Sequence, residues 1–121
     1  MQIAQKNFYK KFLGRAGEIK AAEYLKKKGY MILEKNFKTH FGEIDIIVRD
    51  GEYIVFVEVK TRSGDEYGAP CEAVDARKRE KYFKVAEEYL LRNGKSDSPC
   101  RFDVVEIEKG QINHIINAFC G

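Results

Sequence analysis

The stretch GEIDIIVRDGEYIVFVEVKTR, from Gly42 to Arg62, restricts the fold more than any other part of the chain. Apolar and polar residues alternate along both of its halves, and this is the period of a β-strand with one buried face. Asp50-Gly51 lies between the halves and is typical of the tight turn of a β-hairpin. The polar positions hold carboxylates and cations, which are costly to bury. The stretch therefore predicts a hairpin whose charges need an explanation.

The expected turn sets the pairing of the two strands. With the Asp50-Gly51 dipeptide as the turn, Asp45 lies opposite Phe56 and Glu43 lies opposite Glu58. Asp45 and Glu58 are then diagonal neighbours on one face, within reach of a shared cation. The charged face holds Glu43, Asp45, Ile47, Ile54, Phe56, Glu58 and Lys60. The other face, which we expect to be the main core face, holds Ile44, Ile46, Val48, Tyr53, Val55, Val57 and Val59.

Helices and further strands are expected on both sides of this hairpin. A helix is predicted from about Phe8 to Lys28, followed by a short strand from Tyr30 to Phe37. The polar loop Ser63–Ala73 leads into a second helix, from about Val74 to Leu91. The last segment alternates again and turns at Lys109-Gly110. The order α-β-β-β-α-β-β predicts an α/β or α+β sandwich with about five strands.

The size and composition of the chain are those of one folded domain. A length of 121 residues favours a single domain that spans residues 1–121, and a hydrophobic content of 44% argues against disorder. No apolar run approaches the ~18 residues that a membrane-spanning helix needs. The N-terminus lacks the uninterrupted apolar segment of a signal peptide. We therefore expect a cytoplasmic protein without a membrane partner.

The charges are unevenly distributed, although the formal net charge is only +3. Residues Met1 to Lys38 hold 10 Lys and Arg against 3 Asp and Glu, whereas the remainder holds 12 against 16. This pattern is expected if the first helix contacts phosphates while acidic residues elsewhere hold cations. Lysines at a solvated helix end, where they suit the helix dipole, explain it equally well. The isolated histidines, His40 and His114, are expected to be structural or solvated.

The first helix adds a carboxylate to the acidic residues of the hairpin. Glu18 shares a helical stripe with Ala21, Ala22 and Leu25, so it is expected to face the sheet. A carboxylate in that position needs a partner. Two explanations of the acidic cluster remain open. The acids can form a salt-bridge ladder with the cations of the same hairpin, or they can hold a divalent cation together with water, which is the ligand set that Mg²⁺ requires.

The spacing of these residues resembles a known nuclease motif. Asp45, twelve further residues and then Glu58-Val59-Lys60, with Glu18 upstream, are similar to the motif of the PD-(D/E)xK nuclease superfamily, although Ile44 stands where the motif name has proline. The series GRAGEIKAAEYLKKKGY, GEIDIIVRD, FVEVKTR, RFDVVEI and INHIINAF resembles the YraN family of small bacterial proteins, over residues 12–120. The resemblance implies a restriction-endonuclease-like α/β sandwich with a central mixed sheet, similar to Holliday-junction resolvases.

The resemblance implies a role for each matching residue. Asp45 and Glu58 would bind Mg²⁺ or Mn²⁺, with the Val59 carbonyl as a further ligand and Glu18 as a ligand or outer support. Lys60 would position the attacking water and stabilise the developing negative charge. The candidate contacts to nucleic acid are Thr61, Arg62, Arg15 and Lys78, and Glu43 is a secondary candidate in the acidic cluster.

Three functions of different kinds fit these residues. The first is a metal-dependent phosphodiester hydrolase, an endonuclease that processes or repairs DNA, with branched DNA as one substrate. The second is a nucleic-acid-binding module that keeps the nuclease fold without activity, and the third is a structural protein with a solubilising charged ladder. The presence of all motif residues favours the first, although a shared fold does not define an activity. The analogy with resolvases implies a homodimer, and the loop Ser63–Pro70 is the expected place of substrate selection.

Overall fold

The computed structural model describes residues 2–62 and 76–119, and for residues 2–13 it describes the course of the helix alone. Helices and strands follow one another in the expected order. They are α1 (Gln2–Lys27), β1 (Met31–Thr39), β2 (Gly42–Asp50), β3 (Tyr53–Arg62), α2 (Ala76–Arg92), β4 (Cys100–Glu108) and β5 (Gln111–Ile115). The first helix begins earlier than the expected Phe8. The loop expected at Ser63–Ala73, including its proposed role in substrate selection, lies outside the described residues.

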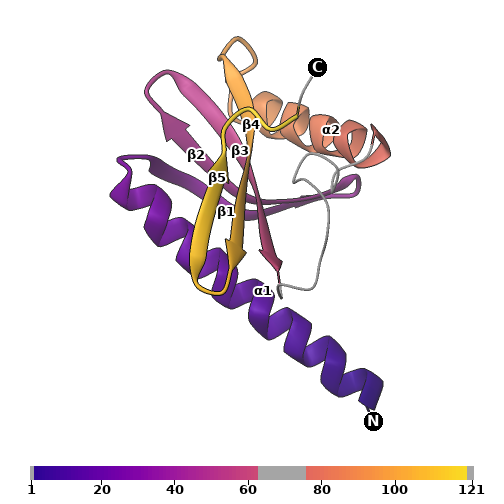
Figure 1. Ribbon diagram of the computed structural model, residues 1–121. Coiled ribbons are helices and arrows are strands. Elements are labelled where there is room, and N and C mark those ends of the chain that lie inside the picture. The colour runs from indigo at the N-terminus through magenta and orange to yellow at the C-terminus, as the bar shows by residue number, and fades with distance from the viewer. Residues whose placement is uncertain (1, 63–75, 120–121) are drawn as a thin grey trace.

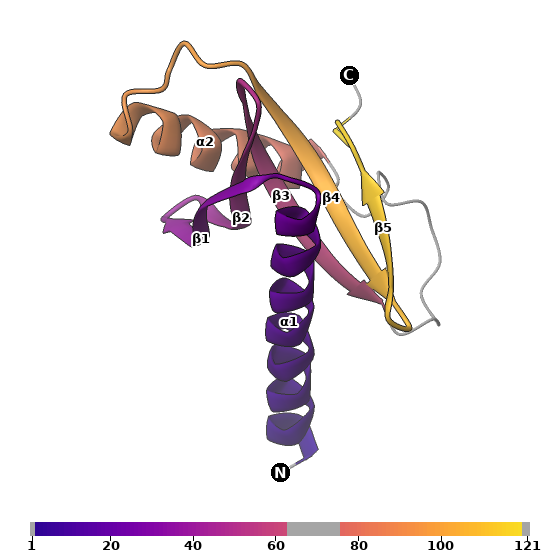
Figure 2. The same cartoon turned by 90° about the vertical axis from the view of Figure 1, so that its left-hand side faces the viewer.

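The five strands of the described chain form one mixed sheet in the order β1-β2-β3-β4-β5. Neighbours are antiparallel except β3 and β4, which are parallel. Parallel neighbours need a crossover connection, and α2 provides it on one face of the sheet. The other face is covered by α1 (Figure 1), whose N-terminal part extends beyond the sheet (Figure 2). The predicted α/β sandwich is therefore confirmed.

Both faces of the sheet are buried, each under one helix. The core under α1 consists of Ala21, Ala22, Leu25, Ile46, Val48, Val55, Val57, Val105 and Ile107. The core under α2 consists of Phe37, Ile44, Ile47, Ile54, Phe56, Tyr82, Val85, Ala86 and Tyr89. The expectation of a single main core face is wrong, because the crossover helix buries the apolar part of the charged face as well. No helix of the described chain is both long and apolar enough to span a bilayer.

The pairing of β2 with β3 differs from the expected register. Asp50 pairs with Tyr53, so the turn consists of Gly51 and Glu52, and Gly51 adopts a positive φ of 60°. Phe56 faces Ile47 rather than Asp45, and Glu43 does not face Glu58. Asp50 stays in the strand because its carboxylate accepts a hydrogen bond from the guanidinium of Arg101, at 3.0 Å. The shift is two residues in total, so each side chain keeps the predicted side of the hairpin wherever the strand is regular.

The strands β2 and β3 separate next to Asp45, and we call this place the fork. Their last pair is Ile46 with Val57, whereas β2 remains paired with β1 as far as Gly42. On the β1 side, Asn36 has a positive φ of 54°. The alternation of β2 breaks there too, because Ile44 and Ile47 belong to the core under α2 while Ile46 belongs to the core under α1. An irregular edge of this kind can turn a side chain toward a site.

Candidate active site

Asp45 occupies the fork and is held by the backbone of β3. Its Oδ2 accepts a hydrogen bond from the Val59 amide at 2.8 Å. One further step of the β2–β3 register would bring Asp45 opposite Glu58. The pKa of Asp45 is raised to about 7, first by burial and next by the nearby carboxylates of Glu58, Glu18 and Glu43, against the lowering effect of the Val59 hydrogen bond. Burial and the neighbouring carboxylates therefore disfavour the ionised form of Asp45.

Glu58 lies beside Asp45 and is held from the side of α2. Its side chain is 13% exposed, and Lys78 Nζ lies 3.6 Å from its Oε1. The hydroxyl of Tyr82 donates a hydrogen bond to Oε2. Burial raises the pKa of Glu58, while the charges of Lys78 and Lys60 lower it. Lys60 thus acts on Glu58 electrostatically from two residues further along β3.

Glu18 reaches the same group from α1. Glu18 can reach this group because the preceding residue, Gly17, brings α1 directly against β3. A methyl group on the Cα of Gly17 would collide with the Thr61 hydroxyl. With its amide nitrogen directed at the carboxylates, Asn36 donates to Glu18 Oε2 at 3.2 Å and to Glu43 Oε1 at 2.9 Å. Burial and then the Glu43 charge raise the pKa of Glu18, whereas the hydrogen bond from Asn36, the hydrogen-bonding interaction with Asp45 and the charge of Arg15 lower it.

The four carboxylates Glu18, Glu43, Asp45 and Glu58 thus act on one another around the fork. Within residues 2–62 and 76–119, no three His, Cys, Asp or Glu side chains have the arrangement of a ready metal site. Mg²⁺ needs only one or two carboxylates when waters complete its shell, so the pair Asp45 and Glu58 is chemically sufficient. Such a cation would offset both the burial and the neighbouring carboxylate charges that raise the pKa of Asp45.

Two predicted contacts to nucleic acid do not point into the fork. The hydroxyl of Thr61 is buried and has no hydrogen-bond partner in the described structure. Arg62 is 8% exposed, and its Nε donates to Glu106 Oε2 on β4 at 2.5 Å. The packing of neighbouring elements explains both positions. Helix α1 lies tightly over Thr61, and the parallel neighbour β4 supplies a carboxylate for Arg62. Arg15 remains exposed beside Glu18.

The sequence pattern does not single out Tyr82 or Asn36 as residues of the site. Tyr82 lies one helical turn after Lys78, so the i, i+4 spacing could have suggested that both side chains reach one target. The sequence predicts an ordinary strand at Asn36, although Asn is depleted in strands and favours the left-handed conformation that it adopts here. Neither signal indicates Glu58 or Glu18 as the partner.

His114 is structural, as expected, and belongs to a buried network away from the fork. Its Nε2 lies 2.8 Å from Asp103 Oδ2, and its Nδ1 lies 3.1 Å from the Tyr24 hydroxyl of α1. Asp103 is fully buried and also accepts two hydrogen bonds from Arg101. Hydrogen bonds from His114 and Arg101 lower the pKa of Asp103 against the effect of burial. The network ties α1 to the β4–β5 hairpin.

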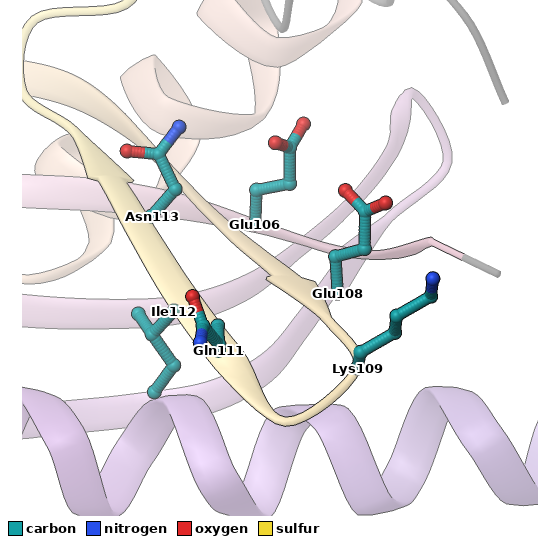
Figure 3. Close-up of a pocket in the computed structure, with 6 residues that line it drawn as sticks. All are labelled: Glu106, Glu108, Lys109, Gln111, Ile112 and Asn113. Atoms are coloured by element: carbon teal, nitrogen blue, oxygen red, sulfur yellow. The ribbon is translucent and has the colours of Figure 1, made fainter. Parts of the chain in front are cut away.

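A surface pocket of about 430 Å³ lies at the tip of the β4–β5 hairpin. Figure 3 shows Glu106, Glu108 and Asn113 projecting from the same side of this hairpin, with Lys109 at the turn. Its lining residues include neither Asp45 nor Glu58. The strand register relates this pocket to β3, because Lys60 of β3 pairs with Glu106 of β4. The pocket is therefore separate from the candidate site.

The fold and the fork define a small α/β protein with a helix on each face of a mixed sheet and a carboxylate cluster between two separating strands. The chain belongs to the family described as uncharacterised protein family UPF0102, whose match covers residues 17–107. The predicted relationship to YraN-type proteins is thereby confirmed. Membership of the nuclease superfamily stays a prediction.

Relatives in this family match nearly the whole chain. This chain is 48% identical over 121 residues to a UPF0102 protein of Caldanaerobacter subterraneus subsp. tengcongensis, and the match covers 94% of this chain and 99% of the relative. A UPF0102 protein of Clostridioides difficile is 50% identical over 109 residues, with 88% of this chain and 95% of the relative covered. One of Symbiobacterium thermophilum is 52% identical over 98 residues, with coverages of 81% and 83%.

Proposed function

We propose that this protein is a metal-dependent nucleic-acid phosphodiester hydrolase, an endonuclease of the PD-(D/E)xK type that acts on DNA. The observation that carries the proposal is the fork. There Asp45 and Glu58 lie beside each other, largely shielded from water, with Lys60 two residues further along β3. A salt-bridge ladder explains this less well, because the pKa of Asp45 is raised to about 7 rather than lowered by a cation.

The donor set fits a hard divalent cation. Mg²⁺ and Mn²⁺ prefer carboxylate, carbonyl and water oxygens. Asp45 and Glu58 would hold the cation, with the Val59 carbonyl as a further ligand and Glu18 as a ligand or outer support. When bound, such a cation supplies Lewis-acid polarisation of a phosphate oxygen and increases the acidity of water.

The remaining roles belong to the side chains around the fork. Lys60 would orient the attacking water and stabilise negative charge that develops on the phosphate. Tyr82 fixes the orientation of Glu58, and Asn36 fixes that of Glu18. The exposed Arg15 would contribute phosphate contacts that position the substrate without reading its sequence.

The resemblance to resolvases supports DNA processing or repair as the wider role, with branched DNA as one substrate and a homodimer as the active form. A cytoplasmic location is part of the same proposal. The basic N-terminal third supports it further, because counter-ion release from phosphates favours binding to such a surface.

Cleavage assays on purified protein test the proposal. Wild type and Asp45→Asn are incubated with linear, flapped and four-way-junction DNA in Mg²⁺, Mn²⁺ or EDTA. Asp97→Asn is the matched control, because Asp97 is an exposed aspartate in the loop after α2. We expect cleavage that requires metal, persists in Asp97→Asn and is lost in Asp45→Asn. Binding without cleavage of any substrate would instead favour a non-catalytic module, and absence of both would contradict any nucleic-acid function.

A further inference from the structure

Glu58 is held from α2 by two side chains that lie one helical turn apart. Tyr82 donates its hydroxyl to Oε2, and Lys78 Nζ lies 3.6 Å from Oε1. Lys78 Nζ also lies 5.9 Å from the centroid of the Tyr82 ring. The three side chains thus form one compact group in which each carboxylate oxygen has its own partner on α2.

The two partners differ in how easily they can move. Tyr82 is buried in the core under α2, and its ring centroid lies 5.7 Å from that of Phe119. Its hydroxyl cannot leave Glu58 without repacking this core. The Lys78 side chain is 44% exposed, and its ammonium is carried on a flexible stem. A partly exposed ion pair of this kind is weak and exchangeable.

A cation bound between Asp45 and Glu58 is best placed at the oxygen beside which Lys78 now lies. Oε2 of Glu58 already uses one of its lone pairs for the Tyr82 hydrogen bond, so Oε1 is the oxygen better suited to a ligand bond. Mg²⁺ binds carboxylate oxygen at about 2.0–2.1 Å. An ammonium held at its present distance from the same oxygen would repel that cation. The two positive charges therefore compete for Oε1.

We infer that Lys78 is an exchangeable counter-ion of Glu58, which neutralises this carboxylate while no divalent cation is bound and is displaced toward a nucleic-acid phosphate when one binds. The inference rests on the proposed function and names the coupling between its two ligands. Displacement makes a positive charge available at the fork, so cation binding strengthens nucleic-acid binding. Linkage requires the converse, and bound nucleic acid strengthens cation binding by the same factor.

Calorimetric titration of the full-length protein with Mn²⁺, without nucleic acid, tests the competition. The variants are Lys78→Gln and, as the matched control, Lys81→Gln, which removes the same charge from an exposed position of the same helix. We expect Lys78→Gln to bind Mn²⁺ about two- to fivefold more tightly than Lys81→Gln, the ratio that corresponds to a partly exposed ion pair. Circular dichroism establishes that each variant is folded.

Fluorescence anisotropy of labelled duplex DNA tests the displacement. We expect Lys78→Gln to bind DNA more weakly than Lys81→Gln in Mn²⁺ and equally well in EDTA. Equal Mn²⁺ affinities of the two variants, with Mn²⁺ binding by wild type, would overturn the inference and leave the proposed function intact. Equal DNA affinities in Mn²⁺ would overturn the displacement in the same way. A wild type that binds no Mn²⁺ and cleaves no DNA would overturn both proposals.

Discussion

Replacing Asp45 by Asn should stabilise the metal-free protein at alkaline pH. Asn keeps the oxygen that accepts the Val59 hydrogen bond and removes a buried charge that lies among other carboxylates. Most substitutions of a partly buried, hydrogen-bonded residue destabilise a protein. A gain in stability at this position is therefore a specific consequence of uncompensated charge.

The size of the effect follows from the pKa of Asp45. It is raised from 3.8 to about 7 in the folded protein, first by burial and next by the charge of Glu58. Because the folded-state pKa is the higher one, the protonated carboxyl favours folding at low pH, and this contribution is lost as the pH rises through about 7. At about 1.4 kcal/mol per pKa unit the full effect is about 4.5 kcal/mol, and partial exposure and salt reduce it to about 2–4 kcal/mol.

Urea denaturation followed by circular dichroism, in EDTA at pH 5 and pH 8.5, measures the effect. We expect the stability advantage of Asp45→Asn over wild type to grow by about 2–3 kcal/mol between these pH values, because wild type alone loses the protonated carboxyl. Asp97→Asn, which changes an exposed aspartate, should show no such growth. An Asp45→Asn variant whose difference from wild type is independent of pH would refute the argument that the fork is short of positive charge.

Three further predictions concern the groups that build the site and its surroundings. Gly17→Ala should destabilise the protein by about 1–3 kcal/mol in urea titrations, because the added methyl collides with the Thr61 hydroxyl and forces α1 away from β3. Unchanged stability would mean that the contact between α1 and β3 at Gly17 is loose. His114→Ala should lower the free energy of unfolding by about 2–4 kcal/mol at pH 7, because Asp103 stays buried and loses one of its hydrogen bonds. A decrease in the free energy of unfolding of less than about 1 kcal/mol would contradict this. Tyr82→Phe keeps the packing of the ring and removes the hydrogen bond to Glu58. The Mn²⁺ affinity measured by calorimetry should therefore fall, while the melting temperature changes by only a few degrees. An unchanged Mn²⁺ affinity would exclude a positioning role of Tyr82.

The alternation of residues within Gly42–Arg62 is enough to predict the hairpin but not its register. Asp45 and Glu58 are expected to be diagonal neighbours in a register that the structure does not have, and they meet at the fork instead. Side chains alternate with a period of two, so a shift of two residues leaves the sides of a regular strand unchanged and cannot be detected from the pattern. Asp50 was assigned to the turn, but Arg101 on β4 holds it in the strand. That partner is distant in the sequence, and no local pattern indicates it.

The helices show the same division. The apolar stripe of α1 correctly placed Glu18 toward the sheet, because a helix of this kind must bury its apolar side. The hairpin pattern predicts the main core on the other face, although the parallel pairing of β3 with β4 requires a crossover that brings α2 onto the charged face as well. Tyr82 and Lys78 meet Glu58 only through this crossover.

The sequence by itself determined the order of the elements, the family and the set of acids and cations that gather at the hairpin, since these depend on residue type and on short-range periodicity. The tertiary structure decided which of them face one another. It separated β2 from β3 at Asp45, directed Arg62 to Glu106 and covered Thr61 with α1. The physical reason is that hydrogen bonds and ion pairs between distant segments depend on the packing of whole elements, and a local sequence pattern does not contain that information.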